Sequence, residues 1–163
     1  MSYPEPRYHG ATGEVSATYR PVGASPEVVY PNGNTVHYLA TGEATHGLFG
    51  LYRWEFGTEP SGPDPHFHRT LTESFYILTG MVRIYDGTQW IDTEPGDFVH
   101  VPEGGTHRFR NESGGPAPML IHFSPGAPGE GYFEGLAEFA RSGRPGAEEL
   151  EAFYRAHDNE WLK

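Results

Sequence analysis

The chain has 163 residues with 22 acidic against 11 basic side chains, a formal net charge of −11, and no cysteine. Its length suits one domain with a moderate core, and its acidic balance argues against binding to nucleic acid or to an anionic membrane surface. The lack of cysteine excludes disulfides, thiolate metal sites and cysteine nucleophiles, so any transition metal would have to be held by histidine and carboxylate.

Residues 1–26 are expected to form an extended N-terminal arm, because they contain four prolines and no sustained apolar periodicity. The arm could lie across a neighbouring subunit or be a partly disordered tail, and the sequence leaves both open. The first ten residues lack the basic and then apolar character of a signal peptide, and no run approaches the ~20 apolar residues of a membrane span. This favours a cytoplasmic protein with no membrane partner.

Residues 27–128 are predicted to form an all-β domain. Asn32 and Gly33 indicate a tight hairpin turn between two β-prone runs. The next strand alternates large aromatic with charged side chains, which is typical of one buried face, and it reads Tyr52, Arg53, Trp54, Glu55 and Phe56. Further short β-prone runs follow at a spacing of roughly 8–12 residues, each ended by glycine, proline or aspartate, which predicts a sandwich or barrel.

Residues 129–163 change to a helical period. Apolar side chains recur at helical spacing over residues 132–140, and Gly143 offers a stop to this first helix. A second helix is predicted over about 147–157, with two glutamates in its first turn. We expect both helices to cap the outside of the sheet.

His66 and His68 are the first candidate metal ligands, and Glu73 follows five residues later. In a strand, residues i and i+2 point the same way and lie about 6.5–7 Å apart, so both imidazoles can aim at one point. A turn after His68 can bring Glu73 to that point from the next strand, where Phe75 and Ile77 would share its inward face. From these residues alone, a metal site and ordinary surface histidines beside a turn remain equally open.

His107 is the third candidate. It shares one face of a later stretch with Phe109, while Arg108 and Arg110 share the other face. Two arginines facing solvent would turn His107 inward, where a buried imidazole needs a hydrogen-bond partner or a metal.

The spacing of these residues resembles the two sequence motifs of the cupin family. The pattern His-x-His-x4-Glu-x6-Gly is filled by His66, His68, Glu73 and Gly80. The pattern Gly-x5-Pro-x-Gly-x2-His-x3-Asn is filled by Gly96, Pro102, Gly104, His107 and Asn111. The first motif usually opens with a glycine six positions before its first histidine, where this chain has Pro60. The resemblance extends over about 48–125.

This resemblance implies a double-stranded β-helix, the cupin jelly roll, which holds one divalent metal at its centre and here carries the C-terminal helices as an extension. His66, His68 and His107 would each ligate through a ring nitrogen, and Glu73 through a carboxylate oxygen. Such ligands suit Zn, Ni, Fe, Mn or Co without choosing among them. All three histidines must be neutral to bind, so the metal should be lost as the pH falls through their titration range.

Side chains on the inward strand faces would line a pocket around the metal. The aromatic candidates, each of which could instead belong simply to the core, are Tyr52, Trp54, Phe56, Phe75 and Phe109. His122 is a further pocket candidate, as a proton carrier, although its strand could also turn it outward.

Among cupins, the chain is similar to small quercetinase-like members, which implies a metal-dependent dioxygenase acting on a flavonol-like or other enolisable small molecule, with Glu73 as catalytic base. The alternatives are a metal-dependent polyketide cyclase or isomerase that uses the metal as a Lewis acid, and a non-catalytic small-molecule-binding cupin. Cupins of this size usually dimerise, so we expect a homodimer. Tyr76 and Leu78, opposite in parity to Glu73, are candidates for its interface or for packing beneath the C-terminal helices.

Overall fold

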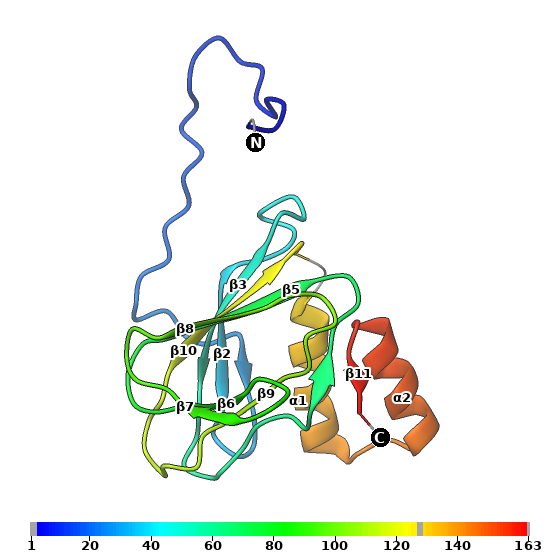
Figure 1. The fold of residues 1–163 in the computed structure, drawn as a ribbon. Helices are drawn as coiled ribbons and strands as arrows, with labels where there is room; N and C mark the ends of the chain where they lie inside the picture. Colours follow the sequence, from blue (N-terminus) through cyan, green and yellow to red (C-terminus); the bar gives the residue numbers. More distant parts are fainter. Residues whose placement is uncertain (1–2, 127–128, 163) are drawn as a thin grey trace.

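Eleven strands and two helices make up the part of the chain that this computed structural model describes, residues 3–126 and 129–162 (Figure 1). The strands are β1 (Val28–Val29), β2 (Thr35–Ala40), β3 (Gly50–Glu55), β4 (His66–Phe67), β5 (Thr72–Ile77), β6 (Arg83–Tyr85), β7 (Trp90–Asp92), β8 (Phe98–Val101), β9 (Arg108–Arg110), β10 (Met119–Ser124) and β11 (Glu160–Trp161). The helices are α1 (Gly129–Ser142) and α2 (Ala147–Ala156). Neither helix is long and apolar enough to cross a membrane.

Two antiparallel sheets enclose the core. The larger has the order β1-β2-β3-β10-β5-β8, and the smaller has the order β7-β6-β9, while β4 pairs with β11 in a separate two-stranded ladder. Phe109 of the smaller sheet packs against Trp54 and Phe75 of the larger one, with ring centroids 6.1 and 5.4 Å apart. The predicted all-β barrel with two C-terminal helices is therefore confirmed.

The strands follow the alternation expected from the sequence. On β3, Tyr52 and Trp54 are buried on the inward face. On β5, Glu73, Phe75 and Ile77 are likewise buried, while Tyr76 on the other face is 43% exposed. A strand places alternate side chains on opposite faces, so the apolar period of two residues determines which side chains reach the core.

The Asn32-Gly33 turn also forms where it was predicted. β1 and β2 pair in antiparallel register, with Val28 opposite Val36. Gly33 has a φ of +87° and donates its N–H to the carbonyl of Tyr30 at 3.0 Å. Glycine suits this left-handed backbone conformation because it has no Cβ.

The two helices occupy a different place from the one expected. Phe133 of α1 packs on the inward-facing rings of Tyr52 and Trp54, with centroids 5.0 and 6.1 Å apart. α1 therefore packs on the inward face of the larger sheet, and α2 packs on α1, with the rings of Phe139 and Phe153 4.9 Å apart. The expectation that the helices cap the outside of the sheet is wrong. The apolar face of α1 needs an apolar surface, and the inward aromatic rings provide it, whereas the outward face of β3 carries Arg53 and Glu55.

Three tyrosine hydroxyls hold α1 on the barrel. Tyr30 donates to the carbonyl of Phe133 at 2.9 Å, and Tyr38 donates to the carboxylate of Glu134 at 3.2 Å. Tyr52 donates to the carboxylate of Glu130 at 2.5 Å, and burial together with this hydrogen bond raises the pKa of Tyr52. The three phenols therefore stay protonated and act as donors.

The N-terminal segment extends away from the barrel (Figure 1). Residues 3–19 are exposed and contain no helix or strand, and Arg20 then forms a salt bridge with Glu27 at 2.7 Å. The boundary of the arm at residue 26 and its contact with a neighbouring subunit stay predictions. The boundary expected between residues 128 and 129 adjoins residues 127–128, which lie outside the described residues.

We expect Glu130→Ala to lower the free energy of unfolding by about 1–3 kcal/mol, because it leaves the Tyr52 hydroxyl and the Gly42 N–H, both bonded to Glu130, without their acceptor. Chemical denaturation followed by circular dichroism measures this change. Glu138→Ala is the matched control, since Glu138 lies on the same helix but is exposed and accepts only from Ser142 of that helix, not from the barrel. Equal losses in the two variants would contradict the anchoring role of Glu130.

Candidate metal centre

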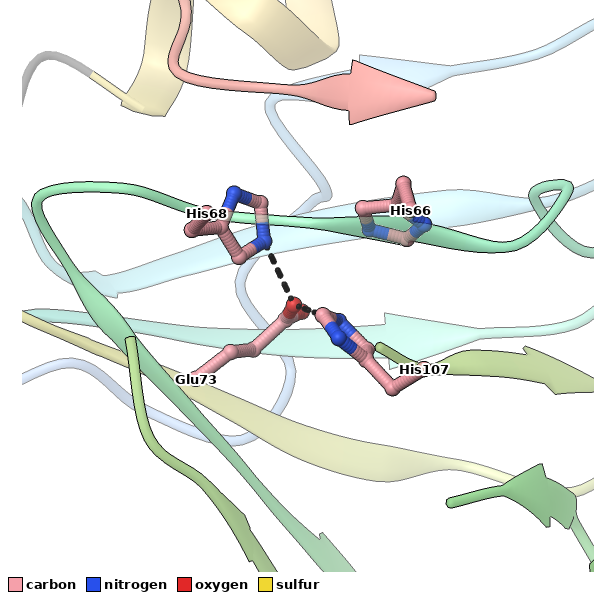
Figure 2. A group of neighbouring side chains, drawn as sticks. All are labelled: His66, His68, Glu73 and His107. Atoms are coloured by element: carbon pink, nitrogen blue, oxygen red, sulfur yellow. Dashed lines mark hydrogen bonds and ion pairs between the residues drawn. The ribbon is translucent and has the colours of Figure 1, made fainter. Parts of the chain in front are cut away.

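Four buried side chains converge at one point inside the barrel (Figure 2). They are His66 on β4, His68 directly after it, Glu73 on β5, and His107 just before β9. One ligand atom from each lies within 4.8 Å of the corresponding atoms of the other three. The structure thus brings together the four residues that the motif spacing singled out.

Backbone pairing holds the two histidine segments side by side. The N–H of His66 donates to the carbonyl of His107 at 3.0 Å, and the N–H of His107 donates to the carbonyl of His66 at 2.9 Å. After His68 the chain turns and continues into β5, which places Glu73 beneath the imidazoles (Figure 2).

Each of the three imidazoles is oriented by a hydrogen bond from Nδ1 to a backbone carbonyl. The pairs are His66 with Asp64 at 2.9 Å, His68 with Asp158 at 2.7 Å, and His107 with Gly105 at 2.9 Å. A carbonyl oxygen can only accept, so every Nδ1 must carry a hydrogen. When the ring is neutral, its other nitrogen, Nε2, presents a lone pair, which is the form that a metal requires; a ring that also donates from Nε2 is an imidazolium.

The position of the Glu73 carboxylate between two imidazoles also favours a bound cation. Its Oε2 lies 3.0 Å from Nε2 of His68 and 2.7 Å from Nε2 of His107. A nitrogen lone pair facing a carboxylate oxygen is repulsive unless a proton or a metal ion lies between them. The donor set of three imidazoles and one carboxylate therefore fits a divalent transition metal.

The charges of the site follow from the same contacts. Burial favours the neutral acid, but hydrogen bonds from His107 and His68 outweigh it and hold the pKa of Glu73 well below its usual range. Burial, reinforced by the neighbouring imidazole of His107, lowers the pKa of His66 to about 4. Burial also opposes protonation of His68, yet its hydrogen bond to Glu73 raises the pKa of His68 overall. The site thus combines a charged carboxylate with a neutral imidazole at His66.

A cavity of about 650 Å³ opens beside these residues, and His66, His68 and Glu73 all line it. Its walls include the aromatic side chains of Trp54, Phe109, Phe123, Tyr132, Phe133, Tyr154 and Trp161. Polar lining residues include Asp64, Arg144, Arg155 and His157. The size and lining are those of a small-molecule site.

The predicted pocket residues have different positions. Trp54 and Phe109 line the cavity. Tyr52, Phe56 and Phe75 are instead buried in the core beside it and are not among the lining residues.

The choice of His122 as a pocket residue is wrong. Ile121 and Phe123 of β10 line the cavity, so His122 between them points to the opposite face of the sheet. There its ring stacks on Phe49 with centroids 5.5 Å apart.

Several lining residues come from the C-terminal part of the chain and were not predicted. Tyr132 and Phe133 belong to α1, Tyr154 to α2 and Trp161 to β11. The helical period did identify the apolar faces of the two helices. Nothing in that period shows that those faces meet the barrel interior, and β11, with two residues, is too short to give a strand pattern.

Comparison with known proteins supports these geometric findings. Residues 52–123 match the model of the cupin domain family. Quercetin 2,3-dioxygenase of Bacillus subtilis is 42% identical over 48 residues, which are 29% of this chain and 14% of that protein. The probable oxidoreductase patJ of Aspergillus clavatus is 37% identical over 76 residues, which are 45% of this chain and 23% of that protein. The chain thus matches less than a quarter of either curated relative.

Solved structures agree at the level of the fold. A predicted oxalate decarboxylase from Thermotoga maritima superposes with a TM-score of 0.60 at 20% identity, covering 67% of this chain and 99% of that one. KdgF from Halomonas sp. gives a TM-score of 0.54 at 17% identity, covering 63% and 86%. The family match, the barrel and the four converging side chains lead to one conclusion: residues 52–123 of this chain are a cupin domain.

Proposed function

We propose that this protein is a metal-dependent cupin enzyme, a dioxygenase acting on a flavonol-like or other enolisable small molecule. The observation that carries the proposal is the convergence of three imidazole nitrogens and one carboxylate oxygen beside a cavity with aromatic side chains in its walls. A divalent ion held by these residues would supply Lewis acidity and, if redox-active, an electron route to dioxygen. The partial match to a quercetin dioxygenase supports the same chemistry.

The cavity favours a planar aromatic ligand that carries oxygen atoms. Its volume of about 650 Å³ and the aromatic side chains in its walls suit a molecule of several fused or linked rings. Trp54 and Trp161 both line it, and within the described residues neither indole N–H has an acceptor. Because buried donors are usually paired, a substrate oxygen is a fitting partner for them.

Glu73 is the proposed base, since it is the buried carboxylate that lines the cavity beside the histidines. Its hydrogen bonds to His68 and His107 keep its pKa low, so it is a weak base in this arrangement. A weak base can accept a proton only from an acidic group. We therefore expect the pKa of the substrate hydroxyl to be lower in the site than in water, so that Glu73 can accept its proton.

A homodimer remains part of the proposal. Tyr76 is 43% and Phe98 is 63% exposed on the outward face of the larger sheet. The same face carries a shallow groove of about 280 Å³, lined in part by Leu51 and Leu120. Because α1 packs on the inward face, Tyr76 does not lie beneath it, and a second copy of this chain is the proposed cover for this face.

We expect the purified chain to sediment at about twice its mass of 18.1 kDa, and Tyr76→Glu to shift it toward the monomer, because the substitution places a charge in the apolar contact. Analytical ultracentrifugation measures both. Tyr85→Glu, on the smaller sheet, is the control and should leave the mass unchanged. A monomeric unsubstituted chain would overturn the dimer.

The chain should bind one divalent transition-metal ion per molecule. His107→Ala should weaken this binding by more than about 100-fold, since even partners of the ligands contribute 10- to 100-fold. Metal content by mass spectrometry and titration with Zn²⁺ check both statements. His122→Ala is the matched control, because that imidazole points to the opposite face of the sheet. Full metal content in His107→Ala would contradict the proposed ligand set.

Oxygen consumption with a panel of flavonols and β-diketones tests the reaction. With Fe²⁺, Mn²⁺, Ni²⁺ or Co²⁺ loaded, we expect uptake with at least one enolisable substrate, and Glu73→Gln should lower the rate by at least about 100-fold through loss of the base. Metal content measured on the same samples separates loss of the base from loss of a ligand. Turnover without oxygen uptake would instead support the cyclase or isomerase, and binding without turnover the non-catalytic cupin.

A further inference from the structure

The C-terminal strap, residues Asp158–Leu162, lies directly against the segment that carries two of the proposed ligands. β11 pairs with β4 so that Trp161 is opposite His66, and the N–H of Leu162 donates to the carbonyl of Pro65 at 3.1 Å. Figure 2 shows β11, in faded red, running beside His66 and His68 on the side away from Glu73.

The three imidazoles differ in where their orienting carbonyls come from. For His66 and His107, the acceptor is the residue two positions earlier in the chain. For His68, the acceptor is the carbonyl of Asp158, which is 90 positions away. Two rings are therefore oriented by their own local backbone, whereas the third depends on docking of the strap.

The side chain of Asp158 anchors that carbonyl. Its carboxylate accepts the N–H of Arg69 at 3.0 Å, and both the N–H and the hydroxyl of Thr70 at 2.8 Å. These groups belong to the turn that directly follows His68. One residue of the strap thus binds the imidazole of His68 through its carbonyl and the turn between His68 and Glu73 through its side chain.

The backbone of Asp158 supports a specialised role. Its φ is +55°, in the left-handed region that residues other than glycine rarely adopt. Such a conformation persists only where surrounding contacts hold it, and here the contacts are those with His68, Arg69 and Thr70.

Trp161 extends the contact to His66. Its indole packs on that imidazole with ring centroids 4.9 Å apart, and the same side chain lines the cavity. The strap therefore touches two proposed ligands and also forms part of the cavity wall.

We propose that Asp158 is a positioning residue of the metal centre, and that docking of the C-terminal strap completes the orientation of His68. This inference rests on the proposed metal-binding function. Loss of the partner that orients a ligating histidine typically weakens metal binding by about 10- to 100-fold. By thermodynamic reciprocity, bound metal must stabilise the docked strap by the same factor.

Titration of the full-length chain with Co²⁺, in competition with a chelator, tests the proposal. We expect Asp158→Ala to raise the Kd by about 10- to 100-fold and to alter the visible absorption of the bound ion, because His68 is no longer oriented. Asp158→Asn, which suits the same φ and keeps an acceptor oxygen, should recover most of the affinity. Asp97→Ala is the matched control: its carboxylate likewise accepts a backbone N–H of a turn, that of Glu94, but at the end of β5 away from Glu73, so the Kd should stay within about twofold.

Hydrogen exchange provides a second measurement that does not depend on how well a variant folds. In the unsubstituted chain, Zn²⁺ should slow exchange of the Leu162 amide, which pairs with Pro65. An unchanged Kd and spectrum in folded Asp158→Ala, or exchange at Leu162 that is indifferent to metal, would overturn the role of the strap while leaving the metal site in place. Failure of the unsubstituted chain to bind Co²⁺ or Zn²⁺ would overturn both proposals.

Discussion

A buried carboxylate surrounded by imidazoles is the constraint around which this molecule is arranged. Glu73 is 3% exposed, and a charge removed from water is tolerated only where opposite charge or hydrogen bonds replace the solvent. Two Nε2 atoms face it, and each ring is held by a carbonyl at Nδ1. The barrel thus maintains a donor set that fits a divalent cation.

The parts outside the two motifs make this centre into a site for a ligand. α1 packs on the inward face of the larger sheet, held there by tyrosine hydroxyls from β2, β3 and the turn after β1. Its aromatic side chains and those of α2 and β11 complete a cavity that the barrel alone would leave open. A cupin fold hosts many chemistries, so this cavity and its donors, and not the fold, determine the reaction.

Local pattern was sufficient for most of the barrel, whereas the ligand set came from the resemblance of the motif spacing to that of cupins. The period of two residues on β3 and β5 places the same side chains inward in sequence and structure, because alternation is a property of the strand itself. The prediction for His122 failed because an error of one residue in the alternation moves a side chain to the opposite face of the sheet. β10 has no alternation of apolar with charged residues that would show which of its side chains face inward.

The sequence by itself determined most of the strands and the two helices, since each depends on spacing within a short stretch, and the resemblance of its motifs to those of cupins identified the four side chains that converge. Only the tertiary structure decided that α1 packs on the inward face of the larger sheet, that Trp161 meets His66, and that Asp158 orients His68. These contacts join residues far apart in the chain, where no local periodicity links them. The C-terminal residues pack where the barrel leaves apolar side chains uncovered and hydrogen-bonding groups without a partner.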